Sequence, residues 1–160
     1  MYVVFTASNK IGSRIIRFVT GESVSHVAVL MPDDSVAHMA FTGLTQQSIV
    51  EFLAHNQAIA RVAVDIDPSI AVARLLAFRQ QHSHLYDYSA LLYLGIMLLY
   101  HRLTGVPHHP IYRNRWQKKS MDTCTEFACW MLGREVNSVI TPGQLLKELR
   151  ENETYVPGIH

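Results

Sequence analysis

A cysteine at the predicted start of a helix is the residue of this chain best placed for nucleophilic chemistry. Cys124 follows Thr123, a favourable helix N-cap, and Glu126 stands three residues after that threonine, which completes a capping-box pattern. Apolar residues recur at helical spacing over 127–132, and Gly133 ends the segment. Because the N–H groups at a helix start are unpaired and the helix dipole favours an anion, we expect Cys124 to form a thiolate readily, beside an anion-binding site.

Two histidines could serve this cysteine as a base and as the group that orients the base. His26 and His38 lie in two apolar segments on either side of a turn at Pro32, and their separation is an even number of residues. In a β-hairpin this spacing predicts that they face each other directly, with Cβ atoms about 4.5–5.5 Å apart. One imidazole would take the Cys124 proton while the other fixes its tautomer. A register slip of one residue would place the two side chains on opposite faces of the sheet. The alternative interpretation is that both are ordinary strand histidines without a catalytic role.

Short strands and helices must position these residues. We predict strands over residues 2–6, 24–31, 35–40 and 59–66, and helices over 13–19, 46–56, 69–81, 88–103, 124–132 and 142–149. The strand at 24–31 carries few charges, which predicts burial on both faces. A small antiparallel sheet combined with helices indicates an α+β fold, and nothing divides residues 1–160 into more than one domain.

Composition argues against several other functions. The chain has 160 residues and a net charge of +1, and it shows no basic stripe that would indicate a nucleic-acid partner. Residues 113–119 carry four positive charges, which we interpret as a solvated loop. Cys124 and Cys129 should point apart on one helix, so an intrachain disulfide is not expected. With two unpaired thiols, no signal-peptide pattern and no apolar run long enough to span a bilayer, we expect a cytoplasmic protein.

The remaining candidate residues are weaker. We expect the histidine pairs at 82 and 84 and at 108 and 109 to lie on the surface, because neither pair has the supporting ligands of a metal site. Cys129 is interpreted as a small buried apolar residue. A metal site formed by His26, His38 and Cys124 is kept as an alternative, since three such ligands would leave an open catalytic position.

Five short motifs occur together in a characteristic order. They are S-H-V-A-V at 25–29, V-A-H-M-A at 36–40, Y-D-Y at 86–88, C-T-E-F at 124–127 and T-P-G-Q-L at 141–145. In this respect the chain resembles the circularly permuted papain-like superfamily, with its permuted NlpC-type cysteine peptidases and amidases, YiiX-like proteins and lecithin:retinol acyltransferase-like enzymes. The order of histidine before cysteine is the mark of this permuted branch. The resemblance covers about 2–46 and 84–149, whereas 47–82 has no place in the family pattern.

The resemblance implies a mechanism and a site. Cys124 would be the nucleophile, His26 the general base and His38 the third, polar member, with Glu126 left to capping. The reaction would be attack on an amide, ester or thioester carbonyl to form an acyl-enzyme, resolved by hydrolysis or acyl transfer. The Cys124 N–H would supply part of the oxyanion hole. The implied substrates are a peptide, a lipid or an acyl-amide, and no cofactor or metal is required.

Two questions stay open at the level of sequence. A catalytically silent lipid-binding or protein-binding accessory module on the same fold is the principal alternative to an enzyme, and contact with a membrane surface is compatible with either. The apolar residues 88–103 form a core helix in our preferred interpretation and a lipid-facing helix in the other.

Overall fold

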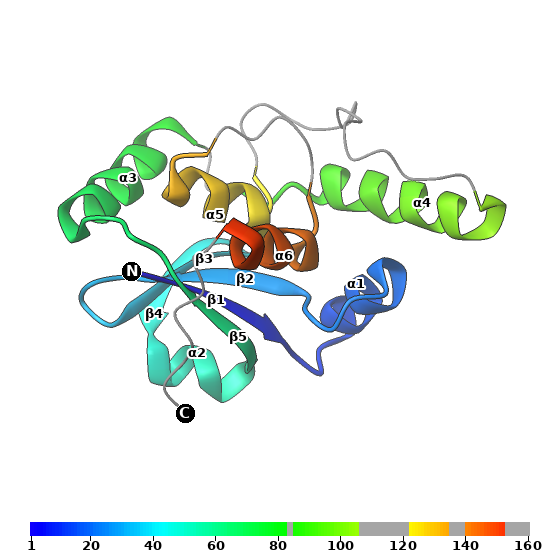
Figure 1. The fold of residues 1–160 in the computed structure, drawn as a ribbon, viewed down its shortest axis with the longest axis horizontal. Helices are drawn as coiled ribbons and strands as arrows, with labels where there is room; N and C mark the ends of the chain where they lie inside the picture. The colour runs from blue at the N-terminus through cyan, green and yellow to red at the C-terminus, as the bar shows by residue number, and fades with distance from the viewer. Residues whose placement is uncertain (83–84, 106–121, 135–139, 153–160) are drawn as a thin grey trace.

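A five-stranded antiparallel sheet is the centre of the fold (Figure 1). The computed structural model describes residues 1–82, 85–105, 122–134 and 140–152. The strands are β1 (Tyr2–Ala7), β2 (His26–Leu30), β3 (Ser35–Ala40), β4 (Gly43–Ser48) and β5 (Gln57–Ala63), in the spatial order β4-β3-β2-β1-β5. The described residues also form six helices: α1 (Ile11–Thr20), α2 (Ile49–His55), α3 (Pro68–Gln81), α4 (Tyr88–Thr104), α5 (Cys124–Leu132) and α6 (Pro142–Asn152). The predicted α+β class is confirmed.

The two faces of the sheet carry different layers. Helices α5, α6 and α3 cover one face, and the short helix α2 covers the other (Figure 1). Side chains alternate between the faces along each strand. On β1, Val3 and Phe5 therefore join the large core beneath α5, whereas Val4 packs in a smaller cluster with Phe52 of α2. On β2 the same alternation buries residues on both faces, as the sequence predicts.

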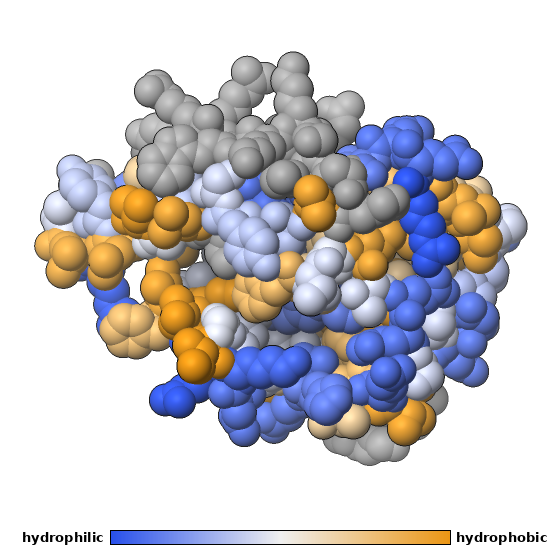
Figure 2. All heavy atoms as spheres, turned by 180° about the vertical axis from the view of Figure 1, so that it is seen from behind, coloured by the Kyte–Doolittle hydropathy of each residue, from blue (hydrophilic) through white to orange (hydrophobic). Residues whose placement is uncertain are grey.

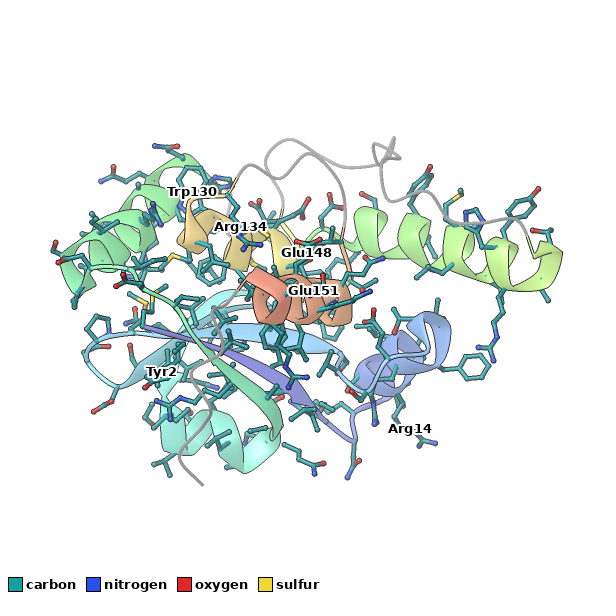
Figure 3. The ribbon with its side chains drawn as sticks, in the orientation of Figure 1. Tyr2, Arg14, Trp130, Arg134, Glu148 and Glu151 are labelled. Atoms are coloured by element: carbon teal, nitrogen blue, oxygen red, sulfur yellow. The ribbon has the colours of Figure 1, made fainter. Side chains whose placement is uncertain are left out.

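Helix α5 has the termini that the sequence predicts. Thr123 accepts a hydrogen bond from the Glu126 backbone N–H at 3.3 Å, and the Glu126 carboxylate accepts one from the Thr123 backbone N–H at 2.6 Å. Gly133 ends the helix in the left-handed conformation, with φ of 69°. Beyond it, Arg134 pairs with Glu148 of α6 at 3.5 Å (Figure 3). The helix start is thus fixed by hydrogen bonds between neighbouring residues of its own segment.

In the segment after β3 the structure differs from the prediction of a helix over 46–56, which was wrong in its first turn. Residues 43–48 instead form strand β4, which pairs with β3 so that Thr45 lies opposite His38. The helix begins only at Ile49, and its N-cap is Ser48, whose side chain accepts a hydrogen bond from the Glu51 N–H. An available edge of β3 therefore outweighed the local signal for a helix, because strand pairing satisfies the backbone over six residues. The predicted strand at 59–66 is also displaced, to Gln57–Ala63.

Some expectations cannot be compared with the structure. The basic segment 113–119 and the histidines at 84, 108 and 109 lie outside the described residues. Within the described ranges, no helix is long and apolar enough to cross a membrane.

The capping box leads to a stability prediction. Replacing Thr123 with alanine removes the acceptor for the Glu126 N–H at a buried helix start, so we expect the free energy of unfolding to fall by about 1–2 kcal/mol. Thr123→Ser keeps the acceptor and is the matched control. Urea denaturation of the two variants measures the difference. Equal losses in both would mean that the threonine contributes through its methyl group and not through capping.

Candidate active site

The two predicted histidines are in direct contact. His26 Nε2 and His38 Nδ1 are 2.9 Å apart, and the rings meet edge to face with centroids at 5.0 Å. Phe52 of α2 packs against His38 with a centroid separation of 5.0 Å. His38 is 7% exposed. A buried, aromatic setting and one shared hydrogen bond therefore hold the imidazoles in a defined mutual orientation.

The way in which the histidines meet differs from the prediction. Direct opposition of His26 and His38 would pair Val29 with Ser35, but the observed register pairs Val29 with Ala37. A displacement of two residues keeps every side chain on its face of the sheet, so the histidines meet diagonally. On β2, backbone pairing with β3 involves Val29 and Leu30, so the two strands separate toward the end of β2 that bears His26.

Cys124 is the first residue of α5, as predicted, and its thiol is buried. The side chain is 4% exposed and lies at a cavity of about 240 Å³. That cavity has a mostly apolar lining, to which α1 contributes Ile15 and Ile16 and α4 contributes Leu98. The sequence position predicted the helix start correctly, but the depth of the burial depends on how α5 packs against β2.

The thiol and the imidazoles occupy neighbouring cavities. His26 and His38 line a second, more polar cavity of about 290 Å³. The two cavities share the side chains of Ile16, Ser25, Phe41 and Tyr86. In the described residues no hydrogen bond joins the Cys124 thiol to either histidine. The structure therefore brings the histidines together and places the thiol nearby, without assembling the three into one hydrogen-bonded unit.

Strand alternation explains this separation. On β2 and β3 the core beneath α5 receives the side chains of Val27, Val29 and Met39. The intervening positions, which include both histidines, face the α2 layer. Cys124 belongs to the α5 layer. A contact between thiol and imidazole can therefore form only at the end of the sheet, where β2 begins with His26.

Burial reverses the expected acidity of the cysteine. Desolvation raises the pKa of Cys124 to about 11, although the backbone N–H groups of Val27, Thr125 and Cys124 act in the opposite direction. The buried Glu126 carboxylate raises this pKa further. Our expectation of a readily formed thiolate is thus wrong for this structure, because the helix-start amides do not compensate for the loss of water.

The histidines are held neutral. Desolvation, together with the charges of His38 and Lys10, lowers the pKa of His26 to about 3. Desolvation and the Lys10 charge lower the pKa of His38 to about 4. At neutral pH the site therefore contains a neutral thiol and two neutral imidazoles. These pKa values exclude a preformed thiolate–imidazolium pair in the free protein, and they oppose transfer of the thiol proton to an imidazole by several pKa units.

Tyr86 is a site residue to which our sequence analysis assigned no role. Its side chain is 5% exposed and lines both cavities. Burial raises its pKa well above the usual value, and the neighbouring Cys124 contributes to the shift. The hydroxyl is therefore a neutral hydrogen-bond donor beside the thiol. The Y-D-Y motif at 86–88 was the available signal, but the motif does not show that its first tyrosine reaches the cysteine.

A second missed contact supports the start of α5 from the other side. His82 was expected on the surface, but its Nδ1 lies 2.6 Å from Asp122 Oδ2, and its ring stacks on Phe78 at 4.1 Å. Burial raises the pKa of Asp122, and the interaction with His82 opposes the shift. The contact ties the end of α3 to the residue two positions before Cys124. Nothing in the local sequence indicates a partner forty residues away.

The alternative metal site can be compared with the structure, and the family resemblance with known proteins. In the ranges that the structure describes, no three residues of the types His, Cys, Asp and Glu converge to hold a metal ion. The alternative metal site on His26, His38 and Cys124 thus has no geometric support. Comparison with family models, with curated proteins and with solved structures finds no match to this chain. The papain-like resemblance accordingly depends on the motifs alone.

The burial of Cys124 predicts a specific pH profile of thiol alkylation. Because the pKa of the thiol is about 11, the iodoacetamide rate should be slow at neutral pH and rise close to tenfold per pH unit up to about pH 9. Mass spectrometry of the modified peptides measures the rate, and His26→Ala should leave the slope unchanged. A plateau below about pH 7 that is lost in His26→Ala would instead show a thiolate–imidazolium pair in the free protein.

The histidine pair predicts a loss of stability in mild acid. The unfolded chain protonates each histidine near pH 6.5, whereas the folded chain keeps the pKa of His26 near 3 and that of His38 near 4. The unfolded state therefore binds more protons below about pH 6.5, and the free energy of unfolding should fall by up to about 1.4 kcal/mol per pH unit for each histidine. Urea titrations between about pH 7 and pH 5 measure this slope. A slope unaltered by joint replacement of both histidines with glutamine would contradict the assignment.

Proposed function

We propose that this protein is a thiol hydrolase or acyltransferase of the circularly permuted papain-like type, acting on an amide, ester or thioester carbonyl through Cys124. The observation that carries the proposal is the neutral imidazole pair of His26 and His38, set in a cavity that shares four lining residues with the cavity of a capped, helix-start cysteine. Two strands and a distant helix supply the three side chains. A packing role alone does not require two histidines with one shared hydrogen bond beside a buried thiol.

The geometry of the pair suggests which atom acts as the base. If the Nε2–H of His26 donates to Nδ1 of His38, the lone pair of His26 lies on Nδ1. That nitrogen would accept the Cys124 proton as the sulfur attacks the carbonyl carbon. The proton would then pass to the leaving amine, alcohol or thiol as the acyl–heteroatom bond breaks. Water or a second acceptor would release the acyl group from sulfur and restore the thiol.

The oxyanion of the tetrahedral intermediate has two candidate donors. The Cys124 backbone N–H is at the helix start, where the helix itself provides no partner. The Tyr86 hydroxyl is neutral and lies beside the thiol. Both donors are buried, which strengthens their interaction with a developing negative charge.

The cavity at Cys124 favours an apolar acyl group. Helices α1 and α4 contribute aliphatic side chains to its lining, among them Ile15, Ile16 and Leu98, and Phe41 and Tyr86 continue this lining toward the histidines. Burial of apolar surface there would contribute about 25 cal/mol per Å² to binding. Of the peptide, lipid and acyl-amide substrates left open by the sequence, those with a hydrocarbon acyl chain fit best. The polar histidine cavity would then receive the leaving group or acceptor.

Two observations favour the competing function. A thiol pKa of about 11 and the missing thiol–imidazole hydrogen bond are what a catalytically silent binding module would show. In such a module the apolar cavity would hold a lipid or a protein side chain without reaction. For an enzyme, substrate binding must bring the thiol and His26 Nδ1 into contact.

Covalent capture of an acyl group separates the two functions. We expect p-nitrophenyl hexanoate to give an acyl group on Cys124 detectable by intact-protein mass spectrometry, and p-nitrophenyl acetate to react more slowly because it leaves the cavity unfilled. Cys124→Ala should abolish acylation, and His26→Ala should reduce its rate by roughly 10²–10⁴-fold. His38→Ala should reduce the rate less, because it acts through His26.

Cys129→Ala is the matched control, since Cys129 is the other buried thiol of α5 and should be dispensable. If the ester is hydrolysed equally by wild type and Cys124→Ala, or not at all, the protein is not a Cys124-dependent acyl-transfer enzyme. Reversible binding of the fatty acid without acylation would then identify the silent module.

A further inference from the structure

One end of the molecule has an exposed apolar surface formed by two helices. Figure 1 shows α1 and α4 side by side at that end, away from α2, and the two helices are in contact. We define the α1–α4 surface by its exposed apolar residues and its arginines, namely Ile11, Ile15, Phe18, Leu92, Ile96, Leu99 and Leu103 together with Arg14 and Arg102. Seen from behind, hydrophobic residues gather over these helices around a hollow (Figure 2).

The apolar residues follow helical stripes. On α1 they recur at intervals of four and three residues, and on α4 Leu92, Ile96, Leu99 and Leu103 recur in the same way. The exposed fractions reach 76% for Ile11, 69% for Phe18 and 78% for Leu103. Contiguous stripes of this kind mark a contact site, in contrast to single exposed apolar residues, which are ordinary.

The charges around the stripes have one sign. Neither α1 nor α4 contains an acidic residue. Arg14 extends from α1 away from the body of the protein (Figure 3), and Arg102 donates to the Phe18 carbonyl at 3.2 Å. Neither arginine is in an ion pair within the described part of the chain. The nearby Glu22 is held by Thr141 and Gly143 of the α6 start.

We propose that the α1–α4 surface docks the protein on an anionic lipid bilayer. Exposed aliphatic and phenylalanine side chains combined with arginines are what a helix lying in the headgroup region requires. A second copy of the chain fits less well, because pairing through this surface would bring arginines together with no carboxylate on either helix to neutralise them. The proposal does not depend on the reactivity of Cys124.

Vesicle flotation of the full-length Cys124→Ala chain tests the proposal apart from any acyl chemistry. We expect flotation with vesicles of phosphatidylcholine and phosphatidylserine in about equal parts, weak flotation with phosphatidylcholine alone, and weaker binding at high salt. Arg14→Gln should lower the partition coefficient about fivefold. Leu103→Gln should lower it roughly tenfold.

Two variants elsewhere on the surface are the matched controls. Val50→Gln changes a side chain of α2 that is 77% exposed, and Arg150→Gln removes an exposed charge of α6; neither should alter binding. The proposal is overturned if anionic vesicles do not bind the protein, or if the control variants reduce binding as much as Arg14→Gln and Leu103→Gln. It is also overturned if the protein self-associates without vesicles and Leu103→Gln makes it monomeric, which would identify a second copy as the occupant.

Discussion

The burial of the α5 N-terminus against β2 is the constraint on which the site depends. A buried helix start must satisfy its own N–H groups, and the reciprocal hydrogen bonds of Thr123 and Glu126 do so. This leaves Cys124 on the first turn, with its thiol near the backbone of Val27. The same burial that secures the helix removes water from the thiol and from the Glu126 carboxylate. Local stability and a high thiol pKa therefore have one physical origin.

Desolvation acts on the histidines in the complementary direction. It lowers the pKa values of both imidazoles while it raises that of the thiol, so the Cys124 thiol and the two imidazoles are uncharged at neutral pH. For an acyl-transfer enzyme, this means that charge would appear only during the reaction, when an oxyanion and an imidazolium form together. The buried Tyr86 hydroxyl and the Cys124 N–H would then matter more than a preformed ion pair. The Lys10 charge disfavours imidazolium, so its distance from the histidines influences the basicity of the pair.

The cavity at Cys124 adjoins the α1–α4 surface. Ile15 of α1 is both an exposed residue of that surface and part of the lining of the cavity at Cys124. A bilayer contact would therefore place apolar molecules beside the thiol cavity. This relation joins the proposed chemistry to the proposed docking, although each has its own test.

The local features of this protein were determined by its sequence. The spacing of Thr123, Glu126 and Gly133 predicted both ends of α5, and the hairpin with its even spacing of His26 and His38 predicted that they share a face. These features depend on hydrogen bonds and side-chain alternation within a few residues of one another, which sequence patterns record directly. The α+β class followed from the same patterns.

Tertiary structure decided the rest. Residues 46–48, which the sequence predicted as helical, instead pair with the β3 edge as part of β4, and the hairpin register differs by two residues from direct opposition. The pairing of His82 with Asp122 and the approach of Tyr86 to Cys124 join segments far apart in the chain. The protonation states of Cys124, His26 and His38 could likewise not be predicted from the sequence, because a pKa depends on how completely the packed layers exclude water.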